Sequence, residues 1–469
     1  MQNKCPFFWI HYIFNVTLHL EMKYNTYTLD NGLRIIHLPS DSQVVYCGYQ
    51  INAGTRNEEP GEEGLAHFCE HVTFKGTERR KAWHILNCLE SVGGDLNAYT
   101  NKEGTVYYSA ILKEHIARAV DLLSDIVFHS VYPQAEIDKE VEVICDEIES
   151  YNDSPAELIY DEFENILFEG SPLGHNILGT AEQVRAFKTE DALRFTQKLY
   201  RPDNAIFFAY GDIDFKKLVK LIQKALGECP KGRELACSTD CNSAETPTEK
   251  RIAEETPTGE TPTEEMEAGD ANHKVQSSKF NVQSKVAGQT IVMQKNTHQA
   301  HVMIGTRAYD VNDDRRMPLY LLNNVLGGPG MNAKLNLALR EHNGLVYTVE
   351  STMVAYGDTG TWSIYFGCDE HDVKRCLRLV RKELDKFMQK PLSDAQLKAA
   401  KKQIKGQIGV ACDNRENFAL DFGKSFLHYG WEKNVDRLYE QVDEITAAQI
   451  QAVAQELFDK DRLTTLIFK

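Results

Sequence analysis

The chain has 469 residues, of which 42% are hydrophobic and 26% are charged, and its formal net charge is −17. This length provides hydrophobic cores for two domains of roughly 200 residues each. The acidic balance argues against nucleic-acid binding, and no stretch is long and apolar enough to span a bilayer. The eleven cysteines are an odd number without paired spacing, which favours reduced thiols and a cytoplasmic protein.

Residues 1–22 form an N-terminal extension of ambiguous character. The stretch from Cys5 to Leu20 is rich in aromatic residues, but polar residues interrupt it and no small-residue cleavage site follows. We interpret the extension either as the result of a start site assigned upstream of the true translation start or as a weak signal peptide. In the second case the protein would be periplasmic.

The next residues predict β-structure. Residues 24–38 read as two strands around Asp30-Asn31-Gly32, a strong hairpin-turn signal. Residues 44–56 begin as another strand and end in a charged loop. A turn with acidic residues follows at 58–64 and suits the positive end of a starting helix.

The most informative motif, His67-Phe68-Cys69-Glu70-His71, comes directly after this turn. Positions i, i+3 and i+4 of a helix share a face, so His67, Glu70 and His71 would point into one volume. Two neutral imidazoles and a carboxylate suit a catalytic zinc ion and a base for the attacking water, and HxxEH is the inverzincin signature. The alternative is a pair of hydrogen-bonded core histidines, so the motif alone leaves zinc binding a hypothesis.

A second helix is predicted over residues 133–151, with Pro133 at its first turn. Glu140 and Glu147 are seven residues apart and therefore lie on nearly the same face, next to the apolar stripe. We predict Glu147 as the third zinc ligand. We assign Glu140 a role beside a ligand or beside the substrate. Acidic residues on a helix are otherwise most often a solvated face.

The rest of the first half mixes hairpin strands with amphipathic helices, and this coarse pattern agrees with an α+β fold. The apolar periodicity predicts a helix at 81–92 ending at Gly93-Gly94, a hairpin at 95–112, amphipathic helices at 114–129, 154–168, 189–200 and 214–226, and a buried strand at 204–210.

Residues 229–278 differ in composition from their surroundings. Glu-Thr-Pro-Thr occurs three times, and residues 240–270 hold ten acidic and two basic residues. A segment this polar cannot bury enough apolar surface to offset the entropy lost on ordering. We therefore predict a disordered linker. The remaining chain carries −9 of the total charge of −17.

The second half resembles a distant internal repeat of the first. Residues 301–310 begin as a strand, and a charged loop and a helix at 317–326 follow, as after the strand at 44–56. The helix at 317–326 contains no histidine or glutamate. The pattern predicts a second domain shaped like the first but without its metal site.

Several separated motifs, in this order, resemble the insulinase/pitrilysin family of zinc peptidases: HFCEHVTFKGT, LESVGGDLNAYTNKEGTVYYSAIL, EVEVICDEIESYNDSP and SPLGHNILGT. Within the family, the chain most resembles short bacterial relatives of the mitochondrial processing peptidase β subunit. The resemblance covers residues 23–227 and 279–469. It implies one zinc ion per chain held by His67, His71 and Glu147, with Glu70 as the base and Glu140 as the family's additional glutamate.

The resemblance also implies roles in substrate binding. Arg340 and Tyr347 match an arginine–tyrosine pair that would stabilise the oxyanion and hold the substrate. Gly327 and Gly328 belong to a glycine-rich loop that the family places near substrate, although Pro329 interrupts it here. The strand with Asn97, Ala98, Tyr99 and Thr100 resembles one that pairs with an extended peptide beside the zinc.

We therefore expect two similar α+β domains, each a mainly antiparallel sheet packed with helices: a zinc-binding domain at 23–228 and a metal-free domain at 279–469. The expected activity is hydrolysis of unfolded peptides or presequences by a zinc endopeptidase. By resemblance the chain forms a homodimer, or a heterodimer with a related subunit. The alternative function is that of a non-catalytic assembly or partner subunit.

Overall fold

The computed structural model describes residues 23–227, 286–295 and 297–469. The N-terminal extension at 1–22 and the predicted linker at 229–278 lie outside the described residues. Among the described residues, every helix is too short or too polar to span a lipid bilayer.

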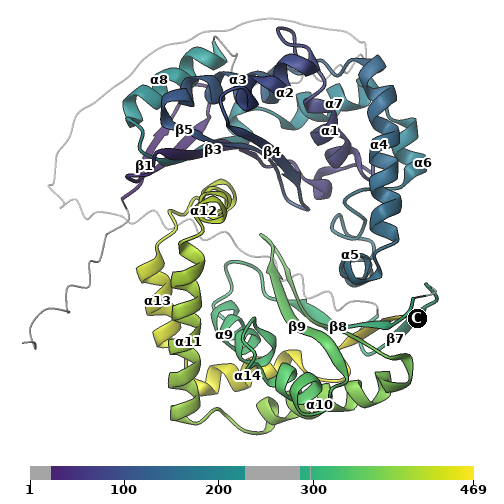
Figure 1. The fold of residues 1–469 in the computed structure, drawn as a ribbon. Coiled ribbons are helices and arrows are strands. Elements are labelled where there is room, and N and C mark those ends of the chain that lie inside the picture. The colour runs from purple at the N-terminus through teal and green to yellow at the C-terminus, as the bar shows by residue number, and fades with distance from the viewer. Residues whose placement is uncertain (1–22, 228–285, 296) are drawn as a thin grey trace, which may run out of the picture. The chain divides into compact units, whose positions relative to one another are not determined.

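The first half contains one six-stranded sheet with helices packed around it (Figure 1). Its elements are β1 (Asn25–Thr28), β2 (Arg34–Pro39), β3 (Val44–Ile51), α1 (Leu65–Thr73), α2 (Ala82–Glu90), β4 (Asp95–Thr100), β5 (Thr105–Leu112), α3 (Ile116–Phe128), α4 (Gln134–Asn152), α5 (Pro155–Leu167), α6 (Ala181–Ala186), α7 (Thr189–Leu199), β6 (Ala205–Gly211) and α8 (Phe215–Leu226).

The strand order of this sheet is β1-β2-β6-β3-β5-β4, and only β2 and β6 run parallel. The predicted hairpin at 24–38 is present as β1 and β2. Its turn residue Gly32 has φ of +90°, a left-handed conformation that glycine adopts without strain. The strand β4 stands at the end of this order and, among the described strands, pairs with β5 alone.

The second half contains a five-stranded sheet. Its elements are β7 (Thr290–Met293), β8 (Ala300–Ala308), α9 (Arg316–Gly327), the π-helix η4 (Asn336–Glu341), β9 (Val346–Ala355), β10 (Gly360–Cys368), α10 (Val373–Gln389), α11 (Asp394–Cys412), α12 (Arg415–Tyr429), α13 (Val435–Glu444), α14 (Ala447–Leu457) and β11 (Thr464–Phe468).

The two sheets repeat one topology. Without β1, the first sheet has the order β2-β6-β3-β5-β4, and the second has the matching order β7-β11-β8-β10-β9. The pairs β2–β6 in the first sheet and β7–β11 in the second run parallel, and the other pairs of both sheets are antiparallel. Helix α9 follows β8 as α1 follows β3, so the predicted repeat is present and α9 takes the place of the histidine-bearing helix.

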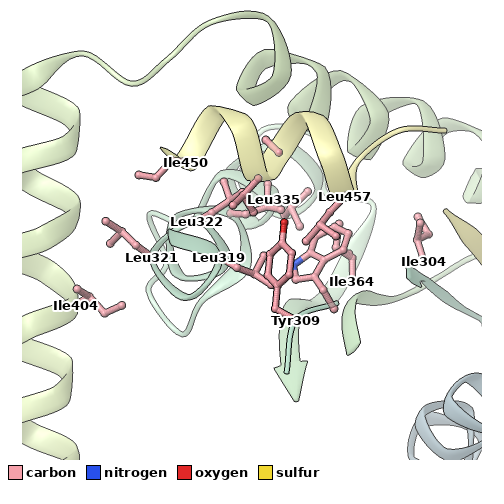
Figure 2. Close-up of a cluster of buried hydrophobic side chains, with 14 of the residues drawn as sticks. Ile304, Tyr309, Leu319, Leu321, Leu322, Leu335, Ile364, Ile404, Ile450 and Leu457 are labelled. Atoms are coloured by element: carbon pink, nitrogen blue, oxygen red, sulfur yellow. The ribbon is translucent and has the colours of Figure 1, made fainter. Parts of the chain in front are cut away.

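Each half has an apolar core between its sheet and helices. In the first half, Phe68 and Cys69 of α1 pack with Tyr49 and Phe207 of the sheet, and all four are fully buried. In the second half, Figure 2 shows leucine and isoleucine side chains of α9, α11 and α14 gathered in one cluster. Helix α1 thus contributes its apolar residues to the core, whereas Glu70 and His71 are only partly buried.

The α+β prediction is confirmed, with small differences at helix starts. Pro133 precedes α4 as its N-cap and is not its first residue, which suits proline because the N-cap needs no amide hydrogen. Residues 113–115 form a short 3₁₀ turn before α3, so the helix predicted at 114–129 begins at Ile116.

Candidate metal centre

Helix α1 supplies three of the predicted site residues. It contains no proline or glycine between Leu65 and Thr73, and its apolar residues are buried on one side. The i, i+4 spacing brings the His67 and His71 rings together, with centroids 4.6 Å apart. The sequence therefore places both imidazoles on the polar face of an otherwise buried helix.

Helix α4 packs against α1 and brings Glu147 to these imidazoles (Figure 1). Oε1 of Glu147 lies 3.8 Å from Nε2 of His67, and Oε2 lies 3.2 Å from Nε2 of His71. The three ligand atoms all lie within 4.8 Å of one another.

These distances fit a zinc ion. Bonds of 2.0–2.1 Å in a tetrahedral arrangement place neighbouring ligand atoms about 3.3 Å apart. The observed separations of 3.2 and 3.8 Å bracket this value. Two imidazole nitrogens and one carboxylate also match the ligand set of catalytic zinc sites, which leave a fourth position open.

The electrostatics of the two histidines differ. Burial, with the charge of His71 nearby, lowers the pKa of His67 to about 4, so its ring is neutral and able to bind a metal at neutral pH. Burial also acts against the charged form of His71, but hydrogen bonds with Glu140 and Glu147 raise its pKa to about 9. The site therefore favours a positive charge at the point where these carboxylates converge.

Glu140 supports His71 from the other side of the ring. Its Oε1 lies 3.1 Å from Nδ1 of His71, and its Oε2 lies 2.5 Å from the ammonium of Lys75. A carboxylate that accepts the Nδ1 hydrogen leaves Nε2 free and orients the ring. Of the two roles predicted for Glu140, the geometry favours the one beside a ligand.

Glu70 lies next to this group and is oriented by Thr100. The Thr100 hydroxyl donates a hydrogen bond of 2.6 Å to Oε2 of Glu70. Burial raises the pKa of Glu70, while the hydrogen bond from Thr100 acts in the opposite direction. A carboxylate with a raised pKa is a stronger base than an exposed one, which suits proton transfer near neutral pH.

The predicted peptide-binding residues form most of the edge strand β4. Thr100 is the one that contacts Glu70, whereas Asn97 is exposed and Tyr99 packs edge-to-face on Tyr108. Within the described residues no strand pairs with the outer edge of β4. The backbone at Ala98 therefore lies in a strand with an unpaired edge close to the candidate base.

The predicted site residues of the second half lie together. Gly327, Gly328, Arg340 and Tyr347 line a cavity of about 880 Å³ in the second half, and this lining includes none of the candidate zinc ligands. The guanidinium of Arg340 lies 5.5 Å from the ring centroid of Tyr347, which is 81% exposed.

Sequence reasoning missed several supporting residues. Lys75 lies in the turn after α1, beyond the last helical residue Thr73, so helical spacing does not mark it. The hydrogen bond from Thr100 to Glu70 spans 30 residues, and the pair of Glu58 with His175 spans 117. Contacts between such distant residues leave no periodic signal in one sequence.

Two profiles of known protein families match the chain. Residues 35–181 match the profile described as insulinase (peptidase family M16), and residues 186–404 match that of the peptidase M16 inactive domain. The second match begins at the end of α6 in the first half and extends into α11 of the half that lacks the histidine motif.

Relatives match along nearly the whole chain. An uncharacterized zinc protease of Bacillus subtilis is 29% identical, over 94% of this chain and 97% of its own. The mitochondrial-processing peptidase subunit beta of Saccharomyces cerevisiae is 30% identical, over 91% and 86%. A protease structure from Helicobacter pylori has the same fold, with a TM-score of 0.77, 21% identity and coverage of 96% and 99%. The chain therefore belongs to the insulinase family of peptidases, peptidase family M16.

Proposed function

We propose that the chain is a zinc-dependent endopeptidase that hydrolyses unfolded peptides or presequences. The observation that carries the proposal is the convergence of His67, His71 and Glu147 next to Glu70. A cluster of two imidazoles and a carboxylate with a buried carboxylate beside it matches the parts needed for metal-assisted hydrolysis. The zinc proteases among its relatives support the same reaction class.

The residues divide the chemistry between them. His67, His71 and Glu147 would hold one zinc ion per chain, and that ion would supply Lewis acidity for peptide hydrolysis. Glu70 accepts a proton from the attacking water and later delivers it to the leaving amine. Thr100 holds the Glu70 carboxylate by its hydroxyl, and Glu140 fixes the ring of His71.

The edge strand β4 favours a peptide as the substrate. A peptide that pairs with β4 would run past Thr100 and therefore past Glu70, because these two side chains are hydrogen-bonded. Strand addition reads the backbone more than the side chains. This mode requires an extended substrate, which a folded protein does not offer, and it permits varied sequences.

The proposed assembly is a homodimer. Arg340 and Tyr347 would stabilise the oxyanion and bind substrate at a zinc site of the dimer. The chain keeps both the candidate zinc ligands and this pair, so two identical copies hold every required part. A heterodimer with a related subunit is the other arrangement.

The test is cleavage of a mixed library of short unstructured peptides by wild type and Glu70→Gln, with zinc content measured on both. Loss of cleavage with zinc retained supports the peptidase and assigns Glu70 as the base. Glu149→Gln, on the exposed side of α4, is the matched control and should cleave normally. A wild type that holds zinc but cleaves nothing would favour the partner-subunit function, and one that binds no zinc would refute the proposal.

A further inference from the structure

Helix α1 begins without a capping side chain at its own N-cap. That position is Gly64, which has φ of +94° and no side-chain acceptor. The first N–H groups of a helix have no partner within the helix and need acceptors from elsewhere. Glu58, six residues upstream, supplies them: its Oε2 accepts from the Gly64 N–H at 3.1 Å and its Oε1 from the Ala66 N–H at 2.7 Å. A negative charge there also complements the helix dipole.

The carboxylate of Glu58 is itself held in place. Its side chain is fully buried, and its Oε2 lies 2.8 Å from Nε2 of His175 in the loop between α5 and α6. Burial raises the pKa of Glu58, and the hydrogen bonds from His175 and the Ala66 N–H act against that shift. The ammonium of Lys102, itself almost completely buried, donates to the backbone oxygen of His175.

The same loop packs directly on the start of α1. A Cβ atom at Gly64 would lie 2.7 Å from the Leu178 oxygen, and one at Gly179 would lie 2.2 Å from the Glu63 oxygen. Both glycines also have positive φ. The two backbones therefore touch at a point where only glycine fits, so the loop fixes the position of the helix start.

These contacts connect the hairpin of β4 and β5 to α1 at two separate points. Lys102 follows Thr100 by two residues at the end of β4, and Thr100 donates to Glu70 on α1. The hairpin of β4 and β5 thus contacts α1 near its middle through Thr100, and it contacts the helix start through Lys102, His175 and Glu58. A helix held at both points has little freedom to rotate about its axis or to slide along it.

We propose that Glu58 and His175 are positioning residues for the zinc-binding helix. This inference rests on the proposed function. Neither residue contacts a candidate ligand side chain in the structure, so both act through the backbone of α1. They set the rotation at which the imidazoles of His67 and His71 meet the carboxylate of Glu147.

Glu58→Gln tests the first residue. A glutamine has one side-chain acceptor oxygen and one N–H₂ group, so it can satisfy only one of the two helix N–H groups and presents a donor to the other. We expect a folded protein whose zinc affinity is about tenfold or more lower. We also expect a shifted visible absorption spectrum of the Co²⁺-substituted protein, because that spectrum reports ligand geometry. For peptide cleavage, kcat should fall while KM stays close to the wild-type value.

The matched control is Glu59→Gln. This residue neighbours Glu58 and carries the same charge, but its side chain is 64% exposed and pairs with Lys198 at 2.8 Å. Zinc affinity and the cobalt spectrum should match wild type in this variant. A change of equal size in both variants would show that net charge, and not the contact with α1, is responsible, which overturns the proposal.

His175 provides an independent test that stands if Glu58→Gln fails to fold. His175→Ala should lower zinc affinity and shift the cobalt spectrum, and His175→Gln, which keeps an N–H donor for Glu58, should restore part of both. Folded Glu58 and His175 variants with wild-type zinc affinity and spectrum would overturn the inference and leave the peptidase proposal intact. A wild type without zinc would instead overturn the proposed function.

Discussion

Nδ1 of His71 lies 3.1 Å from Oε1 of Glu140, while Nε2 of the same ring lies 3.2 Å from Oε2 of Glu147. One imidazole thus bridges two carboxylates of α4. The nitrogen that faces Glu147 converges with His67 on the candidate zinc position, and the other nitrogen donates its hydrogen to Glu140. The seven-residue spacing of the two glutamates on one helix face sets both contacts at once.

Glu140→Gln should lower zinc affinity about 10- to 100-fold, the usual effect of changing a group that supports a metal-ligating histidine. The amide oxygen can still accept the Nδ1 hydrogen, but it carries no charge and leaves the ammonium of Lys75 without its partner at 2.5 Å. Competition with a chelating dye measures the affinity. Glu142→Gln is the control because the Glu142 side chain is 65% exposed and pairs with Arg185, away from the histidines. Unchanged zinc affinity in Glu140→Gln would contradict the role assigned to Glu140.

Most of this geometry could be predicted from the sequence because it depends on local periodicity. The i, i+3, i+4 rule places His67, Glu70 and His71 on one face of α1. The seven-residue spacing places Glu140 and Glu147 on nearly the same face of α4, two turns apart. The sequence indicates the repeat only through similar segments in the two halves. It does not give the strand order, because strand pairing depends on contacts between distant residues.

The residues that hold α1 could not be found in this way. The turn at 58–64 was expected to favour the helix start through its charge, but its specific contribution comes from one residue, Glu58, through two hydrogen bonds to backbone N–H groups. Its partner His175 belongs to a motif of the family resemblance and yet shows no ligand pattern. Only the folded chain brings residues 117 positions apart into contact.

Thr100→Val should shift the acidic limb of the kcat/KM profile to higher pH. Burial raises the pKa of Glu70 and the Thr100 hydroxyl opposes that shift, so removing the hydroxyl raises the pKa further. A base must be unprotonated to act, and a higher pKa moves its active range upward. Thr100→Ser keeps the donor and should keep the wild-type profile; an unshifted limb in the valine variant would exclude Glu70 as the titrating base.

Asp125→Asn should destabilise the first half by about 1.5–3 kcal/mol at neutral pH, the usual range for hydrogen bonds to a charged group. The Asp125 side chain is fully buried and accepts from Thr77 at 2.8 Å and Arg79 at 3.0 Å, and it also pairs with Arg80. Urea unfolding followed by circular dichroism measures the change. Asp121→Asn, which is 42% exposed, should cost less than about 1 kcal/mol.

The same aspartate predicts acid sensitivity. Burial alone would raise the pKa of Asp125, but hydrogen bonds from Arg80, Thr77 and Arg79 outweigh it and lower the pKa. A lowered pKa in the folded state gives stability that is present above the unfolded value of about 3.9 and is lost as the pH falls through the folded value. Wild type should therefore lose stability below about pH 4, and Asp125→Asn should lose less; an equal loss in both would contradict this assignment.

Tyr347→Phe should lower kcat about 10²- to 10³-fold, the usual cost of removing one oxyanion donor. Zinc affinity and thermal stability should stay at wild-type values, because the Tyr347 side chain is 81% exposed and its ring faces Arg340. Tyr27→Phe, another exposed tyrosine, is the control and should leave kcat unchanged. A Tyr347→Phe enzyme with full kcat would remove this hydroxyl from the mechanism.

Mixing Tyr347→Phe with Glu70→Gln then tests whether two copies share their sites. Each variant alone should be nearly inactive. If Tyr347 acts at the zinc site of the partner copy, a mixed dimer pairs an intact Glu70 from one chain with an intact Tyr347 from the other, and activity returns after subunit exchange. If Tyr347 acts at the zinc site of its own chain, every site in the mixture lacks one group and no activity returns. Recovery would thus establish both the dimer and the exchange of catalytic groups between its copies.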